Sequence, residues 1–131
     1  MFAKPWALTM LILLVTLTGC RESAQQQAIN TTSGITIELK PGYSAQVGET
    51  TLTVILTDAQ GAPVEGATVR VRGDMNHAGM VPVNAETAES SGGEYTVPFE
   101  WTMGGDWIVT VEATLADGTV VTRTFDTTIA R

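Results

Sequence analysis

The sequence has one cysteine, Cys20, and no other thiol among its 131 residues. No disulfide can therefore form within the chain. A blue-copper site requires a cysteine thiolate and is excluded from everything after residue 20. Positive charge is also scarce, because seven Lys and Arg stand against 14 Asp and Glu. The net charge of −7 repels nucleic acid, so we expect no nucleic-acid partner.

Helical periodicity and catalytic motifs are missing as well. No segment after residue 33 repeats apolar residues at helical spacing over ten residues. The sequence contains no GxSxG, no HExxH and no glycine-rich phosphate loop, and its single histidine, His77, has no obvious nucleophile beside it. We therefore expect a protein that is not an enzyme.

Residues 1–19 have the pattern of an export signal peptide. Lys4 supplies a positive charge, Trp6 to Leu17 form an apolar run, and small residues precede Cys20. A membrane-spanning helix needs about 20 apolar residues, which is more than this run provides. The pattern therefore favours a cleaved signal over a permanent membrane span.

The ending Leu17-Thr18-Gly19-Cys20 resembles the lipobox of bacterial lipoproteins. In such signals the chain is cut before the cysteine, whose sulfur then carries a diacyl group with fatty acids such as palmitate. The resemblance implies a lipoprotein anchored through Cys20 to the cell membrane or outer membrane, facing the periplasm or the exterior. Two acyl chains are enough for stable anchoring. A plain secretory signal with a chance cysteine is the alternative.

The remaining sequence divides into a tether and one domain. Residues 20–33 are polar and lack aromatics, which predicts a flexible tether. In residues 34–131, short runs rich in Val, Ile and Thr are separated by Gly, Pro, Asp and Asn. This length accommodates one folded domain with one core.

Apolar and polar residues alternate in seven runs of this domain, each of which predicts a strand. Pro82 places one of them at a sheet edge, since proline cannot donate to a ladder. We expect residues 90–93 to form a loop and Asp117-Gly118 to form a two-residue hairpin turn. The predicted strands cover residues 35–40, 50–57, 69–72, 81–87, 94–101, 107–115 and 120–129. The sequence thus predicts an all-β fold, an immunoglobulin-like antiparallel β-sandwich of about seven strands.

Two thioethers and the only imidazole of the sequence lie close together. Met75, His77 and Met80 follow the spacing M-x-H-x-x-M, and polarisable sulfur suits a soft ion such as Cu(I). A third strand that continues past residue 72 would place Met75 and His77 on one face, and Gly79 would allow a bend that returns Met80 toward them. These three side chains are the predicted donors of a copper site.

Two other interpretations of the same segment remain open. Methionines often fill irregular gaps in a core, and His77 can lie in a loop with its ring hydrogen-bonded to the backbone. Zinc fits less well, because one histidine would need three carboxylates and Asp74 is the only one nearby.

Two stretches of the domain resemble known families. Asp58 to Val71 (DAQGAPVEGATVRV) looks like a hairpin common in bacterial immunoglobulin-like and transthyretin-like modules, which implies the fold alone. The segment from Met75 to Met80, the Gly93-Glu94-Tyr95 strand start and the stretch from Phe99 to Val111 (FEWTMGGDWIVTV) together resemble the YtkA-like family, which is related to FixH-like proteins. That resemblance covers roughly residues 35–126.

The YtkA-like resemblance implies an extracytoplasmic, often membrane-tethered domain found in copper-handling and cytochrome-oxidase settings. It places the turn that holds Met103 near the Met/His segment, which makes Met103 an auxiliary donor and lets Trp101 or Trp107 cover a bound cation. The expected function is a lipoprotein that binds Cu(I) as a carrier, buffer or assembly accessory, with a copper-handling or oxidase-assembly protein as partner. The alternative is a structural or interaction module without metal whose exposed sheet edge docks a membrane partner, with Met75 to Met80 as a hydrophobic contact loop.

Overall fold

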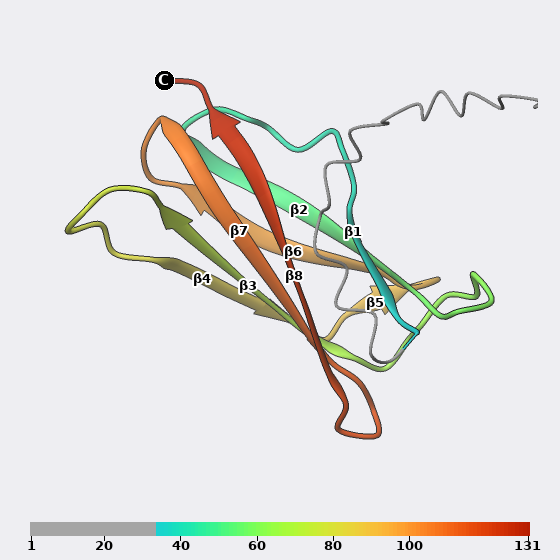
Figure 1. Cartoon of the computed structure of the whole chain (residues 1–131). Helices are drawn as coiled ribbons and strands as arrows, with labels where there is room; N and C mark the ends of the chain where they lie inside the picture. The colour runs from blue at the N-terminus through green and yellow to red at the C-terminus, as the bar shows by residue number, and fades with distance from the viewer. Residues whose placement is uncertain (1–33) are drawn as a thin grey trace, which may run out of the picture.

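The computed structural model describes residues 34–131, which form two packed antiparallel sheets of four strands each (Figure 1). One sheet has the order β1-β2-β6-β5 and the other β4-β3-β7-β8. The strands are β1 (Thr36–Leu39), β2 (Gly48–Thr57), β3 (Thr68–Met75), β4 (Val83–Thr87), β5 (Ser90–Ser91), β6 (Glu94–Trp101), β7 (Gly105–Thr114) and β8 (Val120–Ile129). The predicted signal peptide, lipidation at Cys20 and tether lie outside the described residues.

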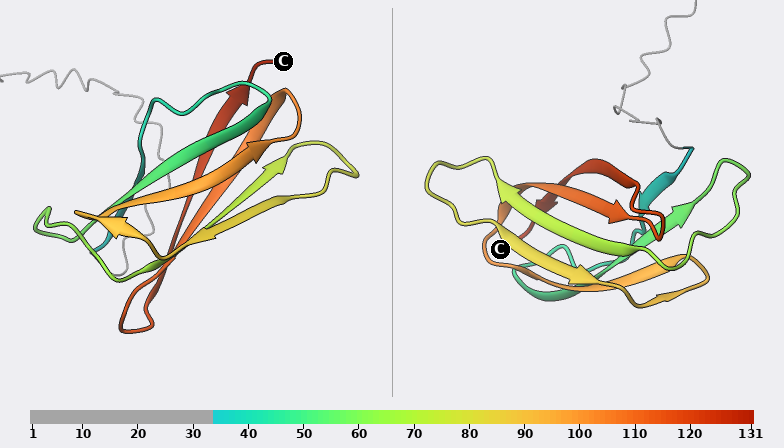
Figure 2. Two further views of the ribbon diagram at one scale, coloured as in Figure 1. Left: turned by 180° about the vertical axis from the view of Figure 1, so that it is seen from behind. Right: turned by 90° about the horizontal axis from the view of Figure 1, so that it is seen from below.

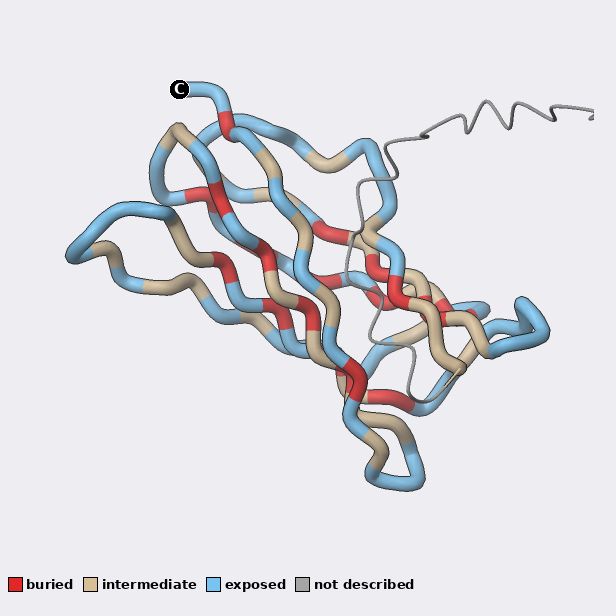
Figure 3. The backbone as a smooth tube through the Cα atoms, viewed as in Figure 1, coloured by how far each residue is buried: buried red, intermediate tan, exposed pale blue. Residues whose placement is uncertain are grey.

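The core lies between the two layers, which the view from below separates clearly (Figure 2). Alternate residues of the long strands point inward, and buried and exposed positions alternate along the chain (Figure 3). In β2, for example, Leu52, Val54 and Leu56 are fully buried while the residues between them are not. This alternation is the one read from the sequence, so the predicted all-β immunoglobulin-like sandwich is confirmed.

Aromatic side chains join the two sheets of the described domain, which contains no cysteine. The ring of Trp101 meets Trp107 edge to face, with centroids 5.3 Å apart, and meets Phe99 in the same manner at 4.9 Å. Such pairs each contribute about 0.5–1.5 kcal/mol beyond their burial. All three side chains are buried, so the two sheets are joined at this level by aromatic packing.

A buried tyrosine holds the long β2–β3 connection against the core. The hydroxyl of Tyr95 donates to the carbonyl oxygen of Val64 at 2.9 Å and accepts from the amide of Ala67 at 3.1 Å. At the start of the same connection, Asp58 Oδ1 accepts from the amides of Gln60 and Ala62, both at 2.9 Å. The connection is therefore fixed at both ends by side-chain hydrogen bonds.

Two local predictions were wrong in detail. Ser90 and Ser91, expected in a loop, form the two-residue strand β5, so the sandwich has seven longer strands and one very short one. The turn between β7 and β8 is longer than two residues, because the Gly118 amide donates to Leu115 O while the Leu115 amide donates to the carbonyl oxygen of Thr119. Gly118, with φ of 87°, occupies the position that requires a left-handed backbone.

The two open sides of the sandwich differ. On one side, Arg123 of β8 donates to the carbonyl oxygen of Ile37 in β1 at 2.6 Å, and Gln46 bridges Ala130 in parallel, so the sheets are tied together. On the other side, β5 pairs only with the first two residues of β6, and β4 is the last strand of its sheet. Within residues 34–131, the rest of β6 on this side and the outer edge of β4 therefore have no strand partner. No helix capable of crossing a membrane occurs within residues 34–131.

Candidate metal site

Met75 is the last residue of β3 and lies on the inner face of its sheet. It stands opposite Trp107 of β7 and packs, half-buried, against the core. Its methyl carbon Cε lies 3.0 Å from the position that a Cβ on Gly105 would take. The absence of a side chain at Gly105 thus leaves room for Met75 beside the β6–β7 turn.

Met103 lies in that turn, between β6 and β7, with 43% of its surface exposed. The indole N–H of Trp107 donates to the carbonyl oxygen of Met103 at 2.9 Å. Trp107 therefore contacts both methionine-bearing segments, through strand pairing with Met75 and through a hydrogen bond to Met103. The structure brings these two segments to the same end of the sandwich (Figure 1).

His77 and Met80 lie in the loop of residues 76–82 that joins β3 to β4. His77 is exposed and Met80 is half-buried. Within the described domain, no hydrogen bond of good geometry and no ion pair ties this loop to either sheet. Gly79, with φ of 83°, lies in a turn of this loop.

The expectation that His77 shares a strand face with Met75 was wrong, because β3 ends at Met75 and residues 76–77 bend away from it. An imidazole at position 77 is therefore positioned by the loop and not by the sheet. Of the four predicted donors, the fold fixes the backbone of Met75 and Met103 near one another, while His77 and Met80 depend on the loop conformation.

The tryptophans do not offer a free ring face to a cation. Trp101 is 0% exposed and Trp107 is 1% exposed, and both rings are occupied by aromatic neighbours. The expectation that one of them covers a bound ion is therefore not met by this arrangement.

Asp74 points to the opposite face of β3 from Met75, since successive strand residues alternate. Its carboxylate binds Arg72, with the two Asp74 oxygens 2.8 and 3.0 Å from the Nε and terminal nitrogen. This hydrogen-bonded pair raises the pKa of Arg72. Among residues 34–131, no group of three or more His, Cys, Asp or Glu side chains could hold a metal ion. The predicted donors do not form such a group, because they are three methionine thioethers and the single imidazole of His77.

Sequence reasoning missed the role of Trp107 and Gly105 in shaping this end of the molecule. The signal was present in the spacing Met103-Gly104-Gly105-Asp106-Trp107, which puts an indole four residues after a methionine across a tight turn. The hydrogen bond from the indole to residue 103 is what this spacing produces.

Comparisons with known proteins agree with this architecture. A sequence model of the family described as YtkA-like matches residues 30–112, more than half of the chain. Among solved structures, the chain is similar to a superoxide reductase (neelaredoxin) from Ignicoccus hospitalis, with a TM-score of 0.55 and 9% sequence identity over 79% of this chain and 86% of that chain. At this identity the likeness concerns the fold alone. No curated protein matches the chain.

Proposed function

Because the chain belongs to the YtkA-like family, we propose that it is a lipid-anchored extracytoplasmic protein that binds Cu(I) through Met75, His77 and Met80, with Met103 as an auxiliary donor. In this role it acts as a carrier, buffer or assembly accessory. Its partner is then a copper-handling or oxidase-assembly protein.

One observation carries the proposal: two thioether-bearing segments meet around Trp107 while the loop with the remaining donors begins at Met75 itself. Thioethers are soft ligands that favour Cu(I) over harder ions. A loop without hydrogen bonds to the sheets can rearrange around an ion at little enthalpic cost, because no protein hydrogen bond must be broken. The exposure of His77 and Met103 leaves the same end accessible to a partner that delivers or accepts the ion.

The second candidate is a docking module that binds no metal. It is supported by Val81, which is 80% exposed in the same loop, and by Val47, which is 45% exposed. Exposed apolar side chains at one end of a domain suit contact with another protein. In this case Met80 and Met103 are contact residues and not ligands.

A competition titration separates the two candidates. The chain beginning at residue 21, which keeps every described strand, is titrated with Cu(I) under anaerobic conditions against a chromogenic chelator. We expect it to withdraw copper from the chelator. The triple variant Met75→Ala, His77→Ala, Met80→Ala should not, and Met103→Ala should compete less well than the wild type.

Val81→Ala is the matched control, since it truncates an exposed residue of the same loop without removing a donor. It should compete like the wild type. Equal competition by the wild type and the triple variant would exclude the proposed site and leave the docking module. Circular dichroism of each variant confirms that the sandwich remains folded.

The lipid anchor is tested separately in a bacterial host that acylates lipoproteins. Mass spectrometry of the full chain should find a diacylated N-terminal peptide that begins at Cys20. The Cys20→Ala variant should move from the membrane to the soluble fraction. An unmodified cysteine in the membrane-free protein would support the plain secretory signal instead.

A further inference from the structure

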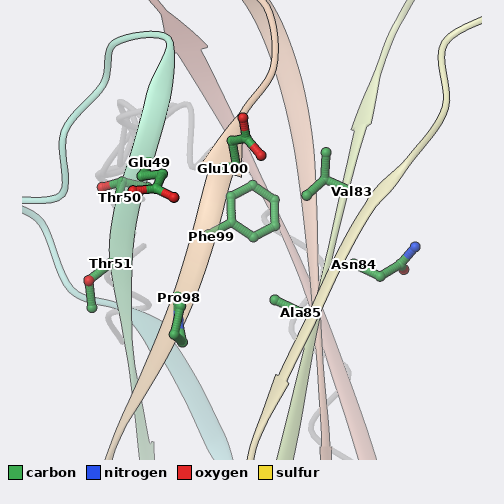
Figure 4. Close-up of a pocket in the computed structure, with 9 residues that line it drawn as sticks. All are labelled: Glu49, Thr50, Thr51, Val83, Asn84, Ala85, Pro98, Phe99 and Glu100. Atoms are coloured by element: carbon green, nitrogen blue, oxygen red, sulfur yellow. The ribbon is translucent and has the colours of Figure 1, made fainter.

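A groove of about 550 Å³ runs along the open side of the sandwich, between the edges of β4 and β6. Figure 4 shows the ring of Phe99 in the gap, with Val83 and Ala85 facing it from β4 and the carboxylate of Glu100 beside it. The groove continues past β6 to Glu49 on β2. It therefore combines an apolar floor with two carboxylates at one end.

The two carboxylates stand directly opposite each other in the strand register, Glu49 against Glu100. Both residues are exposed, and within residues 34–131 neither takes part in an ion pair. Like charges at facing positions of an antiparallel pair destabilise the sheet. A cationic group lodged between them would remove that repulsion, so the charge of the groove selects a basic occupant.

Of the two strand edges on this side, β6 is a poor template for another strand. The Leu56 amide donates to Gly93 O at 2.9 Å, and hydrogen-bonded residues alternate along an antiparallel pair. The backbone groups of residues 95, 97, 99 and 101 therefore bond to β2, whereas the backbone of Pro98 faces the groove. Proline has no N–H, and the ladder on this edge would be interrupted at its centre.

The β4 edge has no such interruption, since Val83–Thr87 contains no proline and β4 is the last strand of its sheet. A second hollow of about 320 Å³, lined by Arg70, Asn84, Ala85 and Glu86, borders the same strand. The groove and this hollow share Asn84 and Ala85. An added strand would thus find space for its alternate side chains on both sides.

We propose that the β4 edge and the groove bind an extended, basic segment of a partner protein by strand addition. A Lys or Arg side chain of that segment enters the groove beside Glu49 and Glu100, and its apolar neighbours on the same face contact Phe99 and Val83. A second copy of this chain is a poor occupant, because its net charge of −7 repels an identical surface. The proposal does not depend on copper binding.

The test uses two blocked nine-residue peptides in which valine and threonine alternate and the central valine is replaced by lysine or by glutamate. Each is added to the isotope-labelled chain beginning at residue 21, and amide shifts are followed by NMR. The lysine peptide should shift the amides of Val83–Thr87 and Glu100 and bind at least about fivefold more tightly than the glutamate peptide.

The double variant Glu49→Gln, Glu100→Gln should lose this discrimination. The double variant Glu38→Gln, Glu89→Gln has the same net charge but changes exposed residues outside the groove, and it should keep the discrimination. The proposal is overturned if the lysine peptide leaves the β4 amides unshifted or if both peptides bind equally. It is also overturned if the control variant loses as much of the difference in affinity between the two peptides as the groove variant does. Concentration-dependent shifts of the same amides without peptide would assign the edge to a second copy, which also overturns it.

Discussion

The indole N–H of Trp107 donates a hydrogen bond of 2.9 Å to the carbonyl oxygen of Met103, and it does so from a side chain that is only 1% exposed. A core residue thus sets the position of a surface turn. The same residue stands opposite Met75 in the strand register. Changes to Trp107 should therefore affect both stability and the candidate metal site.

Trp107→Phe removes this N–H and leaves a smaller ring in the core. We expect the free energy of unfolding to fall by about 2–4 kcal/mol, from the lost hydrogen bond and the incomplete packing. Urea denaturation measures the change. If Met103 and Met75 are donors, Cu(I) affinity should also fall. Trp101→Phe is the comparison, since its indole donates to Ser44 O and not to the β6–β7 turn. An equal loss of copper affinity in both variants would contradict a specific role for Trp107.

Tyr95→Phe should destabilise the domain by about 1–3 kcal/mol, because it leaves the Ala67 amide and the Val64 carbonyl without their shared partner. Urea denaturation of the purified chain gives the value. Tyr43→Phe, which removes one half-buried hydrogen bond to Thr127, should cost less. A larger loss of unfolding free energy in Tyr43→Phe than in Tyr95→Phe would mean that the β2–β3 connection is held mainly by other contacts.

Gly73→Ala tests the close approach of the two sheets. A Cβ at this position would lie 2.7 Å from Phe99 Cζ and 3.1 Å from a ring carbon of Trp107. Overpacking of this kind costs about 1–3 kcal/mol. The combined variant with Phe99→Leu should lose less stability than the sum of the two single variants, by at least about 0.5 kcal/mol. If the losses of unfolding free energy in the two single variants simply add, the Phe99 ring does not limit the size of the side chain at position 73.

Asp117→Ala tests the turn between β7 and β8. The Thr119 amide donates to Asp117 Oδ1 at 2.9 Å, and this bond to the ionised form lowers the pKa of the carboxyl group. A lowered folded-state pKa contributes stability above the ordinary value of about 3.9 and loses it as the pH falls through the folded value. The difference in unfolding free energy between wild type and variant should thus be larger at about pH 7 than at about pH 2. A difference independent of pH would indicate that the charge of Asp117 is not involved.

The strands were predictable because their signal is local. Val69 and Val71 alternate with arginines in the sequence, and the structure buries the valines and exposes the arginines. The edge position of β4, inferred from Pro82, is likewise observed, although the strand begins one residue after that proline. Alternation and proline placement act within a few residues, so the sequence alone reveals them.

The features that were not predicted depend on contacts between distant residues. β3 ends at Met75 although β7 continues for two residues beyond the paired Trp107, and the unpaired edge of β6 follows from the shortness of β5. The lengths of β3 and β5 cannot be read from the local sequence pattern. The candidate site shows the same division, because the donor types could be read from the sequence while the backbone path of His77 could not.

The direction of the strands places the start of β1 and the end of β3 at opposite poles of the domain. The chain reaches β1 at the pole where β2 ends, whereas the end of β3 at Met75 lies at the pole where β2 begins (Figure 1). The ten residues of β2 span about 30 Å between the two poles. For a chain held by Cys20, as proposed, the anchored end joins the domain at the pole opposite the thioethers. An ion bound by the proposed donors would then be exchanged at the end of the domain farthest from the point where the anchored segment joins it.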